Sequence, residues 1–223
     1  MKFIQTAIAA ACLVAAMAPA TAAVVVLDFE GVGNLASINN FYNGGTDSQG
    51  NSGTNYGVAF SSATLGIVDA DAGGSGNFAN EPSASTIMFF QDAANSVLNV
   101  AAGFSTGFSF FYTSSTAASV TVWDGLGATG NLLGSLDLTA QFGDNCSGDP
   151  SGTFCNWTAV GVAFGGTAKS IDFGGTASRT AFDDITFGSK DAGVPAIPEP
   201  STYALMALGL AGIGFVARRR KQV

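Results

Sequence analysis

Phe104-Ser105-Thr106-Gly107-Phe108-Ser109-Phe110-Phe111-Tyr112 is the stretch that indicates the fold class of this 223-residue chain. In an extended strand, successive side chains point to opposite faces, whereas a helix repeats about every 3.6 residues. Phe104, Phe108 and Phe110 are separated by even numbers of residues, so a strand places them on one face. The stretch therefore predicts a β-strand that buries an aromatic face in a core.

The same alternation recurs in short runs along residues 24–193. The clearest further runs are residues 56–60, 87–90, 119–123, 160–164, 169–173 and 181–187. Turn signals follow several runs, at Asp124-Gly125, Gly165-Gly166 and Gly174-Gly175. The pattern predicts an all-β domain of roughly ten strands, arranged as a two-sheet antiparallel sandwich of the jelly-roll type. Long polar loops are expected at residues 39–57 and 69–82.

The N-terminal residues 1–23 have the composition of a secretory signal peptide. Lys2 gives a positive start, an alanine-rich apolar run follows, and Ala20-Thr21-Ala22 supplies a small-x-small cleavage pattern. Cys12 suggests a lipoprotein as the alternative, but it lies within the apolar run and would leave a very short leader. The sequence therefore predicts export of a mature chain that begins near Ala23.

The C-terminal residues 194–223 fall into three parts. A proline-rich stalk contains Pro198, Glu199 and Pro200, and prolines keep such a segment extended. Residues 201–217 carry no charge and predict a transmembrane helix of about 25 Å, at about 1.5 Å per residue. Residues 218–221, Arg-Arg-Arg-Lys, predict a cytoplasmic stop-transfer cluster. A plain membrane anchor is one interpretation of these parts.

Their order and terminal position also resemble the PEP-CTERM signal of bacterial exosortase substrates. The resemblance rests on Pro198-Glu199-Pro200-Ser201-Thr202, the short Gly/Ala/Leu-rich helix and the final Arg cluster. It implies an exosortase-like membrane protease as partner and a transient inner-membrane anchor. It also implies delivery to the cell surface or extracellular matrix of a Gram-negative bacterium.

Charge and composition exclude several functions for the body of the chain. Residues 24–193 contain fifteen acidic residues against Lys169, Arg179 and Lys190, a net charge of −12. Nucleic-acid binding needs a basic surface, so we expect no nucleic-acid partner. The chain has no histidine, which removes the commonest general base and transition-metal ligand.

Cys146 and Cys155 are the only cysteines of residues 24–193. In an exported protein, two cysteines this close in sequence predict a disulfide. A reactive thiol pair is the alternative, but few cations are available to lower a thiol pKa.

Asp183 and Asp184 lie in the last predicted strand. Period-two alternation places Asp183 with Ile185 and Phe187, hence towards the core, where a carboxylate needs donors or a cation. Backbone N–H groups and a cation are both open as the partner. Zn²⁺ is not favoured, because histidine is absent and the thiols are expected to be oxidised.

The body further resembles MAM-type jelly rolls and related carbohydrate-binding sandwiches. The resemblance rests on residues 27–31, 108–112, 120–123, 157–160 and 182–187. It implies that an early glutamate and a late aspartate meet at a structural cation. Glu30 and Asp183 are then the expected Ca²⁺ ligands, with Asp28 as a further candidate, because Ca²⁺ accepts oxygen ligands in irregular geometry.

Five aromatic residues are candidates for a sugar-stacking platform: Phe41, Tyr42, Tyr56, Trp123 and Trp157. A sandwich core uses aromatics at a similar rate, so core packing is the alternative. The adjacent Asp183 and Asp184 point to opposite faces and cannot flank one glycosidic bond, so we expect no enzyme. The expected function is that of an exported, non-enzymatic surface or matrix protein, with polysaccharide attachment as the alternative.

Overall fold

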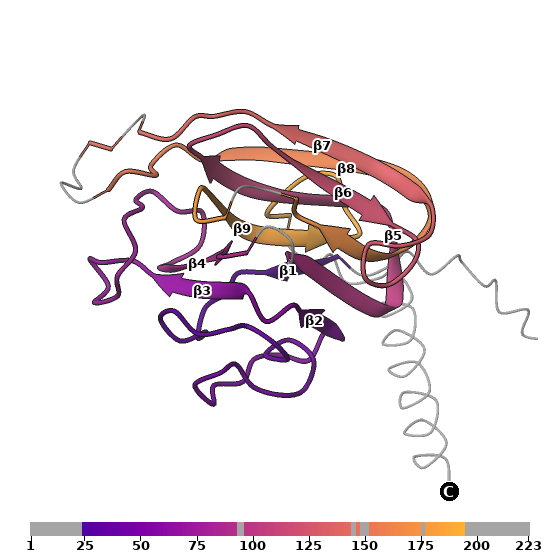
Figure 1. Cartoon of the computed structure of the whole chain (residues 1–223), viewed down its shortest axis with the longest axis horizontal. Coiled ribbons are helices and arrows are strands. Elements are labelled where there is room, and N and C mark those ends of the chain that lie inside the picture. The colour runs from indigo at the N-terminus through magenta and orange to yellow at the C-terminus, as the bar shows by residue number, and fades with distance from the viewer. Residues whose placement is uncertain (1–23, 93–95, 144–145, 148–151, 175–176, 195–223) are drawn as a thin grey trace, which may run out of the picture. The chain divides into compact units, whose positions relative to one another are not determined.

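Nine β-strands form the regular structure of the part of the chain that the structure describes (Figure 1). The structure is a computed structural model, which describes residues 24–92, 96–143, 146–147, 152–174 and 177–194. The strands are β1 (Val25–Leu27), β2 (Val58–Phe60), β3 (Thr64–Val68), β4 (Thr86–Phe90), β5 (Val97–Ser114), β6 (Ala118–Trp123), β7 (Leu132–Leu138), β8 (Thr158–Asp172) and β9 (Thr180–Phe187). All strand pairs are antiparallel, which confirms the predicted all-β antiparallel class.

The strands follow one hydrogen-bonded path, in the order β3-β4-β9-β5-β8-β6-β7, with β1 added on β9 and β2 on β5. In Figure 1, β6, β7 and β8 lie above β1, β2, β3 and β4. The long strand β5 joins the two regions, because its start pairs with β2, its later part pairs with β9, and β8 pairs along its length. The sandwich is therefore one folded sheet rather than two separate sheets.

Residues with positive φ interrupt the regular pairing of the long strands. The β5–β8 register shifts between Asn99 and Phe104 and again before Thr106, and Gly103 and Thr106 have φ of 76° and 75°. Extra residues of this kind increase local bend and twist. Gly165-Gly166 was expected to end a strand, and this expectation is wrong. β8 continues through both glycines as a single strand, with φ of 89° at Gly166.

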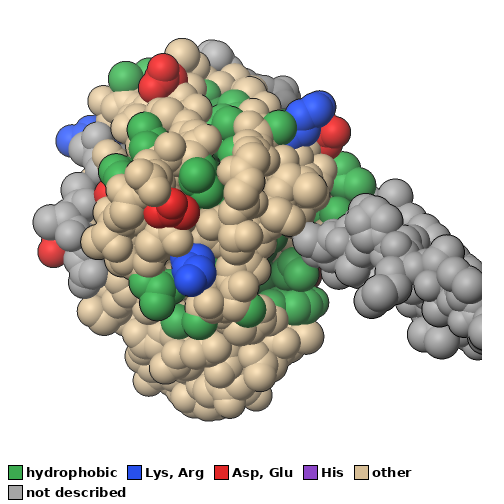
Figure 2. All heavy atoms as spheres, turned by 90° about the vertical axis from the view of Figure 1, so that its right-hand side faces the viewer, with side chains coloured by type: hydrophobic (Ala, Val, Ile, Leu, Met, Phe, Trp, Pro, Cys, Tyr) green, Lys and Arg blue, Asp and Glu red, His purple; other side chains and the backbone are tan. Residues whose placement is uncertain are grey.

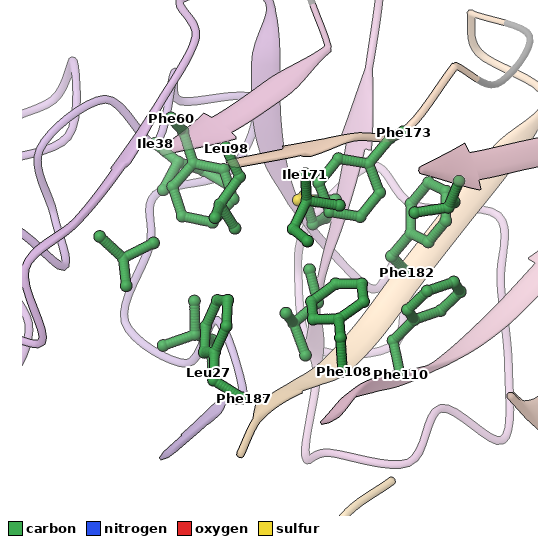
Figure 3. Close-up of a cluster of buried hydrophobic side chains, with 14 of the residues drawn as sticks. Leu27, Ile38, Phe60, Leu98, Phe108, Phe110, Ile171, Phe173, Phe182 and Phe187 are labelled. Atoms are coloured by element: carbon green, nitrogen blue, oxygen red, sulfur yellow. The ribbon is translucent and has the colours of Figure 1, made fainter. Parts of the chain in front are cut away.

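A large hydrophobic core is shared by every strand except β3 (Figure 3), and a smaller cluster forms around Phe78, Ile87 and Ala181. Phe108 and Phe110, from the stretch that predicted the fold class, are fully buried. Phe110 lies edge-on to Phe182 at 5.3 Å between ring centroids, and Phe182 contacts Phe173 at 4.9 Å. The predicted inward face of residues 104–112 is thus confirmed, and aromatic edge-to-face contacts fill much of the core.

A β-bulge in β9 corrects the predicted alternation of residues 181–187. Phe182, Ile185 and Phe187 all belong to the core, although Phe182 and Ile185 are three residues apart. Asp184 has φ of 47°, and the β5–β9 register shifts between the pairs Ser109–Thr186 and Phe111–Asp183. The extra residue moves the strand from one face to the other, so strict period two does not hold here.

The disulfide and the polar loops agree with the sequence analysis. Cys146 and Cys155 form a disulfide with their Cα atoms 5.0 Å apart. Residues 39–57 contain no strand, and Asp47 organises part of this loop by accepting hydrogen bonds from the backbone of Gly33, Gln49 and Asn51.

Within the described ranges, no helix has the length and apolar character needed to cross a membrane.

Candidate functional site

Asp183 is fully buried and lies where β9 changes partners. β9 pairs with β4 at Ala181 and Phe182, and with β1 from Ile185 onwards. At this junction the Asp183 carboxyl accepts hydrogen bonds from the backbone N–H of Ser83 at 2.8 Å and of Asp184 at 2.7 Å. The hydroxyl oxygen of Ser83 lies 2.8 Å from Asp183 Oδ1 and 2.9 Å from the carbonyl oxygen of Asp28. Asp183 therefore links β9 to the segment before β4 and to the end of β1.

Burial raises the pKa of Asp183 to about 8, because removal from water disfavours the charged carboxylate. The hydrogen bonds from Ser83 lower the pKa of Asp183, whereas the nearby charge of Asp184 raises it further. The Ser83 hydroxyl has one proton to donate and faces three oxygen atoms, the two carboxyl oxygens of Asp183 and the carbonyl oxygen of Asp28.

Glu30 forms hydrogen bonds to the same segment before β4, at Ser85 and Thr86. Its Oε1 atom accepts hydrogen bonds from the backbone N–H groups of Ser85 and Thr86, both at 2.8 Å. The segment from Ser83 to Thr86 leads into β4, so two carboxyls from β9 and the end of β1 together position the start of that strand. The predicted neighbourhood of the first and last strands is confirmed, because Leu27 pairs with Ile185.

The expected calcium ligands therefore lie around the segment from Ser83 to Thr86, but each carboxyl already accepts hydrogen bonds from the protein. Asp183 and Glu30 accept the N–H and O–H groups described above, and Asp28 Oδ1 accepts the N–H of Glu30 at 3.2 Å. Among the described residues, no three His, Cys, Asp or Glu side chains form a group that could hold a metal ion. A calcium ion would have to displace some of these hydrogen bonds.

A polar pocket of about 250 Å³ adjoins this arrangement. Its main polar and aromatic lining is Asp28, Glu30, Tyr42, Ser52, Thr54 and Tyr56. The chain turns at residues 28–31 to form one wall, and residues 52–56 form the other. Hydrogen bonds from the N–H of Gly53 to Phe41 and of Tyr56 to Tyr42 hold the second wall against the aromatic floor.

The pocket aromatics divide between core and surface. Phe41 and Tyr42 are 2% and 3% exposed and belong to the core, whereas Tyr56 is 41% exposed and stacks on Tyr42 with centroids 6.1 Å apart. The Tyr42 hydroxyl accepts the N–H of Phe29 at 2.8 Å. Burial, with the nearby charge of Asp28, raises the pKa of Tyr42 well above its usual range. Tyr42 thus stays neutral, and Tyr56 is the aromatic surface that remains available.

The two tryptophans lie outside the pocket. Trp157 is partly buried, packs edge-on to Phe78, and donates its Nε1–H to the carbonyl oxygen of Ala79 at 3.0 Å. Trp123 is half-buried and donates to Thr121 at 2.9 Å. Core packing therefore describes Phe41, Tyr42 and Trp157, and the structure does not bring the five candidate aromatics together as one platform.

A second hollow, of about 150 Å³, lies over β4 and β9. Its lining is mainly apolar, from residues such as Phe78, Phe89 and Phe154, and Arg179 is its charged member. Recognition of a polar ligand needs several convergent polar groups, which the pocket beside Tyr56 has and this hollow lacks. The pocket beside Tyr56 is therefore the better candidate site.

On the molecular face in Figure 2, uncharged polar and backbone atoms cover most of the surface, and the basic groups stand apart. Lys190 forms an ion pair with Asp191 at 2.8 Å.

Sequence analysis did not identify Ser83 or Ser85 as site residues. Ser83 is 100 positions from Asp183 in sequence, and a serine in a polar loop has no distinguishing signal of its own. The predicted signal peptide, the transmembrane helix and the motif Pro198-Glu199-Pro200 lie outside the described residues.

Comparison with known proteins identifies the C-terminal segment. Residues 196–221 match the PEP-CTERM protein-sorting motif, so this chain carries the exosortase sorting signal that the sequence predicts. The motif indicates an exported protein that an exosortase processes.

Comparison with solved structures adds a partial match. A carbohydrate-binding module from lichenase 5A of Cellvibrio mixtus, solved in complex with cellotriose, is similar with 16% identity and a TM-score of 0.33. The match covers 58% of this chain and 88% of that module. No curated protein matches the chain.

Proposed function

We propose that this chain is a non-enzymatic cell-surface or matrix protein of a Gram-negative bacterium. The match of residues 196–221 to the PEP-CTERM motif is the observation that carries the proposal. Residues 1–23 direct export, residues 201–217 hold the precursor transiently in the inner membrane, and an exosortase-like protease processes it. The lack of histidine and the burial of Asp183 behind Ser83 support a role without catalysis.

Processing at both ends is the direct test of this proposal. The intact mass of protein released from the cell surface is expected to correspond to a start near Ala23 and an end close to residues 198–202. Neutral replacements of residues 218–221 are expected to weaken membrane retention of the precursor, because basic residues stay on the cytoplasmic side. Released protein that still contains Arg218 to Arg220 would contradict the proposal.

We propose attachment to polysaccharide as the activity of the β-domain. The observation that favours it is the pocket, in which a 41% exposed tyrosine stands beside carboxylate and hydroxyl groups. Aromatic faces stack on sugar rings, and the hydroxyls of Ser52 and Thr54 and the carboxylate of Asp28 supply hydrogen-bonding groups around the ring. The accessible lining of the pocket is mainly polar, with Val26 and Phe41 as its apolar members.

Affinity electrophoresis in gels that contain different soluble polysaccharides measures this binding. Tyr56→Ala is expected to weaken binding about two- to tenfold, the effect of one aromatic contact. Phe142→Ala is the matched control, since Phe142 is 43% exposed but does not line the pocket. Absence of binding to every polysaccharide, or equal losses in both variants, would reject the pocket as the site.

A structural Ca²⁺ ion is the third proposal, with Glu30, Asp183 and Asp28 as ligands. The acidity of the body and the convergence of Glu30 and Asp183 on one segment support it. Ca²⁺ at a hundred times its Kd is expected to stabilise the wild type by about 2.7 kcal/mol relative to EGTA, and Asp183→Asn to remove this difference. Thermal unfolding and elemental analysis provide the measurement. A wild-type midpoint that EGTA leaves unchanged, with no ion recovered, would reject the calcium site.

A further inference from the structure

We propose that the pocket beside Tyr56 selects a sugar that carries a free ammonium group, such as a unit of a deacetylated hexosamine polymer. The inference rests on the polysaccharide-binding activity proposed above and adds the chemical class of the ligand. Three features carry it: the fixed shape of the pocket, the open carboxylate oxygen of Asp28, and a pocket lining that contains no basic side chain.

The loop segments that form the pocket are held in place by close packing and hydrogen bonds. Gly53 lies directly against the ring of Phe41, where even a Cβ atom would collide with the aromatic carbons. Phe41 in turn packs edge-on to Tyr42 at 4.8 Å, and Tyr42 is hydrogen-bonded to the backbone of Phe29. The wall that carries Tyr56 is therefore held in position before any ligand arrives, which reduces the entropic cost of binding.

Asp28 supplies the charge that is available to a ligand. Its side chain is exposed, and its Oδ1 atom accepts the N–H of Glu30, whereas no group among the described residues donates to Oδ2. Glu30 differs, because its Oε1 atom already accepts two backbone N–H groups, from Ser85 and Thr86. The open oxygen at the pocket is thus Asp28 Oδ2.

None of the basic residues Lys169, Arg179 and Lys190 lines the pocket. A carboxylate-bearing sugar would find like charge from Asp28 and Glu30 and no cation to pair with it, which disfavours uronic acids. A neutral N-acetylated sugar stacks on Tyr56 but offers Asp28 only an amide N–H. An ammonium group adds opposite charge and a charge-assisted hydrogen bond to Asp28, so the deacetylated sugar is favoured.

The full-length protein in detergent and EGTA, at physiological salt and in a mildly acidic buffer that keeps the sugar amine protonated, is tested by calorimetry against three hexasaccharides: glucosamine, N-acetylglucosamine and galacturonic acid. We expect the glucosamine hexamer to bind about tenfold more tightly than the N-acetylated one, as for a hydrogen bond to a charged group. The galacturonate hexamer is expected not to bind. Asp28→Asn is expected to bring the first two affinities to within about twofold, because the amide removes the charge.

Asp71→Asn is the matched control, because Asp71 is exposed, carries the same charge and lies outside the pocket. It is expected to leave the preference unchanged. Preference for glucosamine that survives Asp28→Asn, or that Asp71→Asn reduces equally, would assign the effect to the general acidity of the protein and overturn the inference. Equal binding of the acetylated and deacetylated hexamers would overturn it while polysaccharide binding stands, whereas no binding of any hexamer would reject both.

Discussion

In EGTA, the folded domain is expected to lose stability as the pH rises from about 4 towards 8. Burial raises the pKa of Asp183 from 3.8 to about 8, so between these values the folded state holds a proton that the unfolded state has released. The folded state then binds more protons, and stability falls with pH by up to about 1.4 kcal/mol per unit. Below pH 4 both states are protonated and this contribution is constant. Urea denaturation at a series of pH values measures the slope.

Asp183→Asn is expected to flatten this slope, because an amide does not titrate in the range. The variant also loses part of the bonding, since an amide nitrogen cannot accept the N–H that one carboxyl oxygen now accepts. Its stability at low pH is therefore expected to fall below that of the wild type. Asp137→Asn, at an exposed position of β7, is expected to retain the wild-type slope. Identical slopes in the wild type and Asp183→Asn would show that Asp183 is not the titrating group.

Replacing Phe108 by alanine is expected to lower the free energy of unfolding by about 3–5 kcal/mol. Phe108 is fully buried and its ring contacts those of Phe104, Phe110, Phe173 and Phe187. Loss of the ring leaves a cavity that rigid neighbours on two layers cannot close. Urea denaturation of the full-length protein, followed by tryptophan fluorescence, gives the value.

Phe142→Ala is the control for this change of size and hydrophobicity. Its side chain is 43% exposed and contacts Phe154 at 5.8 Å between centroids, so we expect a loss within about 0.5 kcal/mol. A small loss for Phe108→Ala, similar to the control, would contradict the assignment of Phe108 to a close-packed core.

The strand patterns could be predicted from sequence where the backbone is regular. Phe108 and Phe110 share an inward face because nothing interrupts the alternation between them. The prediction fails at Gly165-Gly166 and at Asp184, because both are bends within a strand. A Gly-Gly pair is found both in turns between strands and in bends within a strand, so its sequence does not distinguish the two. Asp184, with its positive φ, lies where β9 stops pairing with β4 and begins pairing with β1. Such long-range pairing is not visible in a local pattern.

The candidate site was predictable in part. Asp183 is buried as expected, but the alternation that placed it on the face of Ile185 is broken by the bulge at Asp184. Its donors include backbone N–H groups, one of the alternatives that the sequence left open. The role of Ser83 depends on a contact between residues far apart in sequence, so no spacing reveals it. Tyr56 was one of five aromatics, and only the fold shows that it, unlike Phe41 and Tyr42, keeps an exposed ring.

The place of β9 in the sheet has a consequence for the order of events during export. β9 is the last strand in sequence, yet it lies between β4 and β5 and is the strand on which β1 is paired. A chain that crosses a membrane from its N-terminus therefore cannot complete its sheet until residue 187 has emerged. Sheets dominated by such distant pairings fold slowly, which favours an unfolded chain throughout passage. Under the proposed function, we expect closure of the domain to coincide with arrival of the sorting segment at the membrane, where the proposed anchor would hold the chain while it folds.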